Sequence, residues 1–228
     1  MPAQQAAGDT ASARVTIDGA AGSNQLVQQV IRFGQGWSQR RGSDVDQEVL
    51  YVVSGWGMLS MDGDVYDLEP GTGVYVVAGE RYAIENPGPE PLLVVSVLTP
   101  QREAPPAYRS VTVRFEDQPE LRADENRTFR YLVNQDAGCR DVTQFVGIVQ
   151  PCRAPDHSHT YDEVGYVIEG EGFAHIGDRH VPLKAGSCFH LPPQLVHCIE
   201  NSGTGVMRIL GVFHPSGDPA SRAYQTNK

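Results

Sequence analysis

The first 156 of the 228 residues contain no histidine, and all seven histidines lie between residues 157 and 214. An imidazole-based site can therefore come only from the C-terminal part of the chain. The four cysteines also lack the CxxC spacing that is typical of zinc and redox motifs. We expect them to be reduced thiols, at positions Cys139, Cys152, Cys188 and Cys198.

The sequence lacks the features of an exported or membrane-spanning protein. Its first ten residues have neither a basic start nor an apolar stretch, so no secretory signal is expected and the cytoplasm is the expected compartment. No apolar run approaches the roughly 18 residues that a membrane helix needs. The net charge of −10 and the pI near 5.1 argue against nucleic acid or an anionic membrane as a partner.

Turn-forming residues are abundant, with 24 glycines and 16 prolines. Between them lie short runs rich in β-branched and aromatic residues, such as Glu48–Val53, Val164–Ile168 and Met207–Phe213. Many short strands at close spacing predict an all-β barrel or sandwich. One short helix is expected within residues 117–126.

The two halves of the chain repeat each other. An offset of 115 residues aligns them without a gap, which indicates two copies of one structural unit. The clearest matches are Glu48–Gly57 with Glu163–Gly172, and Ile84–Asn86 with Ile199–Asn201. We therefore expect an N-terminal barrel over residues 14–100 and a C-terminal barrel over 111–217, joined by a linker at 101–110. Residues 1–13 are expected to be flexible and residues 218–228 to form a tail.

Four polar residues of the second half form one constellation. His157 and His159 are two residues apart, so on a strand both side chains leave the same face. Glu163 follows after a polar turn, and His197 arrives from a later strand. Three imidazoles and one carboxylate are a ligand set that borderline divalent metals favour.

The first half lacks this set. With the offset of 115, Gly42, Asp44 and Tyr82 stand where the second half has histidines, and only Glu48 matches a ligand, Glu163. One carboxylate holds a transition metal poorly, so we expect the N-terminal barrel to be metal-free.

Between residues 25 and 215 the chain resembles a bicupin, a protein of two cupin barrels in tandem. The two cupin motifs are carried by His157, His159, Glu163 and Gly170, and by Gly186, Pro192, His197 and Asn201. Pro151 and Gln194 replace motif glycines, which puts the turn geometry in doubt rather than the ligands. The resemblance implies two jelly-roll (double-stranded β-helix) barrels. It also implies one divalent metal ion per chain, which can be Fe, Mn, Ni, Co, Cu or Zn.

Other side chains are candidates for binding a small-molecule substrate. Arg153 is four residues before His157, so on a regular strand its side chain would point inward like that of His157. There its guanidinium could pair with a carboxylate of the substrate. The full set of candidates is Arg153, Tyr161, His175, His190 and Arg208. Each has a structural alternative, as a packed or surface residue. His180 is expected to be exposed and His214 to be structural, while alternation turns Cys198 away from the metal.

These features indicate a small-molecule enzyme with a single metal ion. A dioxygenase-like oxidoreductase acting on an enolisable or carboxylate substrate is the preferred interpretation, with Glu163 as the catalytic base when it leaves the metal. The first alternative is a non-redox metal enzyme: an isomerase, cyclase, decarboxylase or an enzyme resembling the ureidoglycine aminohydrolases. The second is a barrel that binds a small ligand without turnover. Because sheet edges must be covered, a homodimer is also expected.

Overall fold

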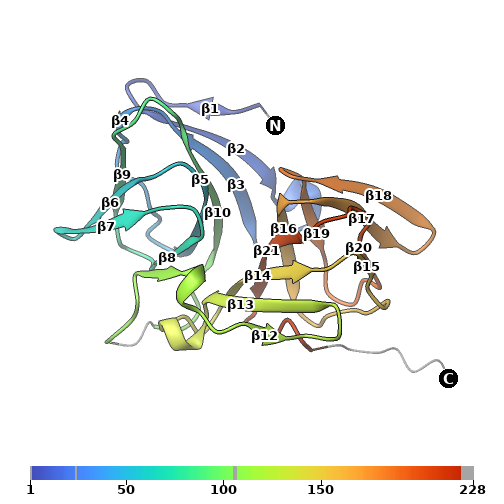
Figure 1. The fold of residues 1–228 in the computed structure, drawn as a ribbon. Coiled ribbons are helices and arrows are strands. Elements are labelled where there is room, and N and C mark those ends of the chain that lie inside the picture. The colour runs from blue at the N-terminus through green and yellow to red at the C-terminus, as the bar shows by residue number, and fades with distance from the viewer. Residues whose placement is uncertain (1, 24, 105–106, 222–228) are drawn as a thin grey trace.

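The structure is a computed structural model that describes residues 2–23, 25–104 and 107–221. Within these residues it consists of antiparallel β-sheets and three short 3-10 helices, and it forms two barrels that lie side by side (Figure 1). The all-β prediction with two tandem jelly-roll barrels is confirmed. The expected helix within 117–126 is wrong: the 3-10 helix η2 (Phe115–Asp117) ends there and β12 (Leu121–Arg122) follows.

Each barrel is made of a large and a small sheet. In the N-terminal barrel the large sheet has the order β1 (Gln4–Gln5), β2 (Ala11–Ile17), β3 (Val27–Phe33), β10 (Leu92–Pro100), β5 (Asp46–Ser54), β8 (Thr72–Val76) and β11 (Thr112–Arg114). Its small sheet has the order β4 (Gly36–Trp37), β9 (Tyr82–Asn86), β6 (Gly57–Met61) and β7 (Asp64–Leu68). The 3-10 helix η1 (Gly19–Ala21) connects β2 to β3.

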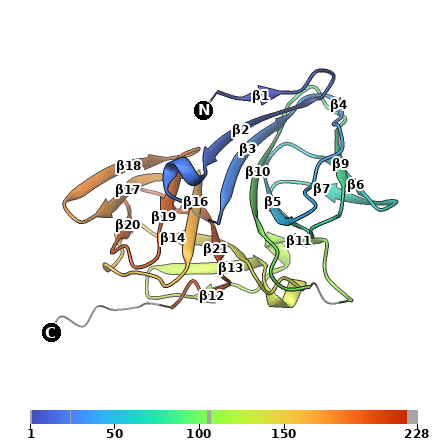
Figure 2. The same ribbon diagram turned by 180° about the vertical axis from the view of Figure 1, so that it is seen from behind.

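The C-terminal barrel repeats this plan. Its large sheet has the order β12, β13 (Arg127–Val133), β14 (Thr143–Val149), β21 (Met207–His214), β16 (Asp162–Glu169) and β19 (Cys188–Leu191). Its small sheet has the order β15 (Cys152–Arg153), β20 (Cys198–Asn201), β17 (Glu171–Ile176) and β18 (Arg179–Lys184). The 3-10 helix η3 (Gln135–Ala137) lies between β13 and β14, and the views from both sides show β13 passing close to the N-terminal barrel (Figure 2).

The two barrels share one hydrophobic core. Val49, Tyr51 and Val97 of the first large sheet pack in the same cluster as Val164 and Leu210 of the second. The central strands β5 and β16 are therefore covered on both faces, which explains their near-continuous burial and their runs of apolar residues. The inner faces of the sheets form separate hydrophobic cores, one set within each barrel.

The structural repeat is not gapless. β2, β3 and β4 match β13, β14 and β15 at an offset of 116 residues, whereas Glu48 and Tyr82 match Glu163 and His197 at 115. The bridge Arg41–Tyr82 corresponds to the bridge His157–His197, so Arg41 takes the place of His157. The gapless alignment, which paired His157 with Gly42, is wrong by one residue here. The turn before Glu48 is one residue longer than the turn before Glu163. The length of a turn does not change the alternation within the flanking strands, so sequence periodicity does not reveal it.

The predicted domain limits differ from the structure at two places. Within the segment 1–13, expected to be flexible, Gln4–Gln5 pairs with β2, whose first residue is Ala11. β11, expected in the second barrel, pairs with β8 of the first. Parts of the predicted linker and tail, at 105–106 and 222–228, and Met1 lie outside the described residues. Among the residues that are described, no helix has the length and apolar character needed to cross a membrane.

Candidate functional site

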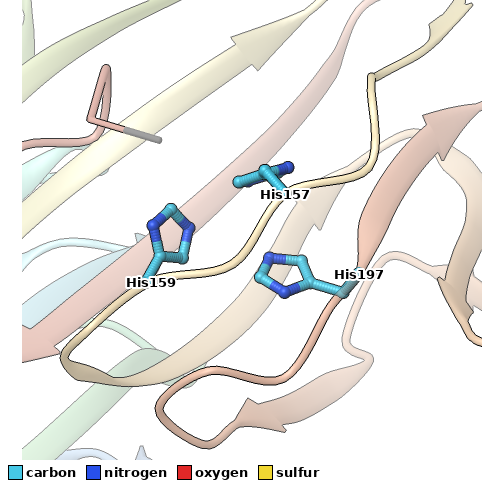
Figure 3. A group of neighbouring side chains, drawn as sticks. All are labelled: His157, His159 and His197. Carbon is cyan, nitrogen blue, oxygen red and sulfur yellow. The ribbon is translucent and has the colours of Figure 1, made fainter. Parts of the chain in front are cut away.

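Three histidines converge inside the C-terminal barrel. His157 and His197 form an antiparallel bridge with backbone hydrogen bonds of 2.9 and 2.8 Å, which places their side chains next to each other. His159 lies two residues further on, and its carbonyl accepts a 2.7 Å hydrogen bond from the amide of Gln194. One ring nitrogen from each histidine lies within 4.8 Å of the others, and Figure 3 shows the three rings facing a common point.

The turn before His197 has Gln194 where the cupin motif has a glycine, and Gln194 adopts the backbone conformation that glycine would have there. Gln194 has φ 65, in the left-handed region that glycine adopts most readily, and its counterpart in the first barrel is Gly79, with φ 93. The substitution at Gln194 therefore leaves the turn in place.

Hydrogen bonds fix the orientation of all three rings. Nδ1 of His157 lies 3.0 Å from the carbonyl oxygen of Pro155, and Nδ1 of His197 lies 2.9 Å from that of Leu195. Because a carbonyl only accepts, both Nδ1 atoms carry the proton. Nδ1 of His159 lies 2.9 Å from the Tyr161 hydroxyl, which itself donates to a backbone carbonyl, so this Nδ1 donates as well. The lone pair of each neutral ring is therefore on Nε2, the nitrogen that can coordinate a cation.

Glu163 completes the group. Its side chain is buried on β16, and Oε2 lies 3.5 Å from Nε2 of His159 and has no hydrogen-bond partner among the described residues. Burial raises the pKa of Glu163 to about 8. Burial, together with His157 and His197, lowers the pKa of His159 to about 3. Neutral imidazoles beside an unpartnered buried carboxyl oxygen fit a divalent cation, because a cation would satisfy both.

The histidines open into a small, mainly apolar cavity of about 90 Å³. Its wall contains four phenylalanines and several aliphatic side chains: Phe129, Phe145, Phe189, Phe213, Val149, Leu191, Ile199 and Ile209. Arg127 also lines it, held by Asp124 through contacts of 2.7 and 2.8 Å. Sequence analysis missed Arg127, although the alternation Arg127, Phe129, Tyr131 would have placed it on the same face as Phe129.

Of the candidate substrate residues, only Tyr161 reaches the histidines. Its ring is buried and stacks on His159, with centroids 4.7 Å apart. Arg153 lies on the outer face, with Nε 3.4 Å from Cys198 Sγ, so the inward direction predicted for it is wrong. Residues 154–156 are not part of a strand, so the alternation of side chains between the two faces cannot be counted from His157 back to Arg153. Cys198 is buried and faces away from the histidines, as alternation predicted.

The other three candidates also lie away from the cavity. His190 bonds to Asp162 at 2.6 Å, next to Ser23 of the first barrel. His175 lies on the outer face of the small sheet. Arg208 pairs with Glu169 at 3.2 Å, and its guanidinium lies 5.7 Å from the centre of the Phe115 ring. These strands alternate as expected, but sequence alone could not say which face was internal.

The matching position of the first barrel is filled by the chain itself. Glu48 is buried, and its Oε1 accepts hydrogen bonds from Tyr82, at 3.1 Å, and from Ser96. Arg41 stands where the second barrel has His157, and its guanidinium lies 3.7 Å from Asp9. Burial raises the pKa of Glu48, while Ser96, Arg41 and Tyr82 lower it. A guanidinium and two hydroxyls thus supply the partners that a cation would provide.

Similar structures share the fold over almost the whole chain. A crystal structure of protein Ylba from E. coli has a TM-score of 0.79 at 15% identity, covering 96% of this chain and 89% of that one. A structure of Bacillus subtilis oxalate decarboxylase, described with Mn(II) centres, has a TM-score of 0.77 at 14% identity and covers 95% and 75%.

Among curated sequences, an uncharacterised protein of Methanocaldococcus jannaschii is 33% identical over 60 residues, which are 26% of this chain and 48% of that protein. The chain spans between a fifth and about half of the length of the curated relatives that it matches. The model of the Cupin domain family matches twice, at residues 30–98 and 146–213. These two matches cover more than half of the chain and agree with the two observed barrels. The chain belongs to the cupin family and carries two cupin barrels in tandem.

Proposed function

We propose that the C-terminal barrel is a metal-dependent enzyme site for a small molecule, with His157, His159, Glu163 and His197 as the ligands. The observation that carries this proposal is the convergence of three ring nitrogens, each left with a lone pair by the hydrogen bond at Nδ1. The partnerless Oε2 of Glu163, 3.5 Å from His159, supports the carboxylate as the fourth ligand.

The lining of the cavity indicates the class of substrate. Arg127 is the cationic side chain in a wall that is otherwise mainly apolar, and a guanidinium favours a carboxylate or enolate oxygen. The cavity volume of about 90 Å³ suits a small molecule. We therefore propose a small carboxylate or enolisable substrate whose charged end faces Arg127 and whose apolar part contacts Phe129 and Phe145.

Dioxygenase-like oxidation is the chemistry that we favour. A divalent ion supplies Lewis acidity, and a redox-active one also supplies electrons for oxygen chemistry. The apolar wall excludes water from the reacting centre. Among the described residues that line the cavity, the titratable ones are the proposed ligands and Arg127, so the available base is Glu163 in a state in which its carboxylate has left the metal.

A non-redox reaction is the second candidate. Of the isomerase, cyclase, decarboxylase and aminohydrolase alternatives, the fold likeness to oxalate decarboxylase, which is described with Mn(II) centres, supports the decarboxylase. A barrel that binds its ligand without turnover is the third. A homodimer also remains our expectation for the assembly.

Elemental analysis of the full chain purified without added metal, followed by substrate assays, tests the proposal. About one ion per chain is expected, falling to a small fraction when His157, His159 and His197 are replaced by alanine. Oxygen uptake with Fe(II) and a panel of enols, diketones and small carboxylic acids identifies an oxygenase. Turnover with Mn(II) under anaerobic conditions identifies the non-redox class instead. Equal metal content in parent and triple variant would refute the ligand assignment.

A further inference from the structure

A second pair of histidines lies on the outer face of the C-terminal small sheet. His175 on β17 and His180 on β18 are directly opposite each other across the hairpin. Their Nδ1 atoms are 2.6 Å apart, and Nε2 of His175 lies 2.6 Å from Oε2 of Glu200 on β20. His175 is buried and His180 is exposed, so the pair reaches from the sheet to the surface.

Glu200 determines which nitrogen of His175 is available. An ionised carboxylate only accepts, so Nε2 of His175 carries a proton and donates it. The lone pair of its Nδ1 then points at Nδ1 of His180, and a single proton lies between the two nitrogens. A carboxylate that receives the far N–H of an imidazole is also the usual partner of a metal-binding histidine.

We propose that His175 and His180 chelate a divalent cation such as Zn²⁺ through their two Nδ1 atoms, with Glu200 orienting His175. Two nitrogens that bind one tetrahedral Zn²⁺ at about 2.0–2.1 Å are about 3.3 Å apart. The observed 2.6 Å therefore has to open by about 0.7 Å on the tetrahedral geometry, and the exposed ring of His180 can make this movement. The cation takes the place of the proton between the two nitrogens, this proton moves through solvent to the exposed Nε2 of His180, so that both rings stay neutral, and water completes the coordination.

The proposed surface site is separate from the histidine cluster inside the barrel. Ala174, the neighbour of His175, packs in the barrel core, so alternation turns His175 to the opposite face. The matching hairpin of the first barrel pairs Ser60 with Val65, although Glu85 is in the place of Glu200. The hairpin of the first barrel therefore has the same backbone arrangement but no imidazoles. The proposed surface site does not depend on the proposed enzyme activity.

Calorimetric titration of the full chain with Zn²⁺, after the internal site has received one equivalent, tests this proposal. The parent is expected to bind a further equivalent, and His180→Ala is expected to lose it while keeping the first. Glu200→Gln keeps both imidazoles but loses the carboxylate, so its affinity for the second ion should fall about 10- to 100-fold. Val181→Ala, next to His180 on the same exposed strand, is the matched control and should retain both ions.

The His197→Ala variant separates the two sites, because it should lose tight binding inside the barrel and keep the Zn²⁺ bound by the hairpin. Three results would overturn the proposal. They are a parent that binds no second equivalent, a second equivalent that persists in His180→Ala, and a loss in Val181→Ala as large as in His180→Ala.

Discussion

The hydroxyl of Tyr161 lies 2.9 Å from Nδ1 of His159, and the two rings stack with their planes 15° apart. The hydroxyl also donates to the carbonyl of Asp218 at 3.1 Å. Phe213 also stacks on Tyr161, with centroids 4.2 Å apart, and its ring centroid lies 5.7 Å from that of His159. Tyr161 therefore fixes both the tautomer and the rotation of one proposed ligand, although it lies outside the cavity wall.

Replacing Tyr161 with phenylalanine keeps the stacking and removes the hydrogen bond to His159. We expect metal affinity to fall about 10- to 100-fold, since partners of this kind usually have that effect. Competition with a chromogenic chelator measures it. Tyr131→Phe is the control, because Tyr131 bonds to the side chain of the same Asp218, at 3.3 Å, and not to a histidine. Equal affinities in the two variants would contradict this role of Tyr161.

The pKa of Glu163 predicts how the metal-free protein responds to pH. Burial raises this pKa from 4.5 to about 8, so the folded state holds the proton more tightly than the unfolded chain. Its contribution to stability is complete below pH 4.5 and is lost as the pH rises through 8. One pKa unit corresponds to about 1.4 kcal/mol, so the loss is at most about 5 kcal/mol.

The Glu163→Gln variant isolates this effect in urea unfolding of metal-free protein. Its free energy of unfolding should lack the decline between pH 4.5 and 8 that the parent shows. The lowered pKa of His159, at about 3, acts in the opposite direction: stability is lost as the pH falls from 6.5 towards 3. That loss is common to both proteins, so their difference reports Glu163. Parallel profiles for parent and variant would rule out the burial argument.

Arg127 is expected to select carboxylate substrates. Replacing it with glutamine should raise KM for a carboxylate about 10- to 100-fold, because a hydrogen bond to a charged group contributes about 1.5–3 kcal/mol. An uncharged analogue of the same shape should bind equally well to parent and variant. Arg122→Gln, at an exposed residue that also contacts Asp124, is the matched control. If both analogues lose affinity equally, Arg127 acts by packing rather than by charge.

Gly211 leaves room for an aromatic ring of the cavity wall. A Cβ at this position would lie 2.4 Å from two ring atoms of Phe145, so Gly211→Ala must displace that ring. We expect a loss of about 1–3 kcal/mol in stability and a change in the size of substrate accepted. Gly205→Ala, where no atom lies within 4 Å of the new Cβ, should be within about 0.5 kcal/mol of the parent. Thermal unfolding of both variants and KM values for a size series measure these effects.

Much of the fold and part of the site could be predicted from the sequence. Short apolar runs and turn residues predicted the strands, the repeat predicted two barrels, and the two-residue spacing of His157 and His159 placed both side chains on one face. These predictions depend on periodicity and composition, whereas the approach of His197 was expected from the resemblance to bicupins. Arg127 was missed because it is the first residue of β13, and a charged residue at the end of a strand reads like part of the preceding turn.

The fold class, the duplication and the single histidine-bearing barrel are encoded directly in residue type and alternation. Which face of each strand is internal depends on long-range packing, and this packing places four predicted substrate residues outside the cavity: Arg153, His175, His190 and Arg208. The tertiary structure also places Arg41, rather than Gly42, at the position of His157. The physical reason is that a strand has two equivalent faces until another sheet covers one of them, and that a turn can gain one residue without disturbing either strand.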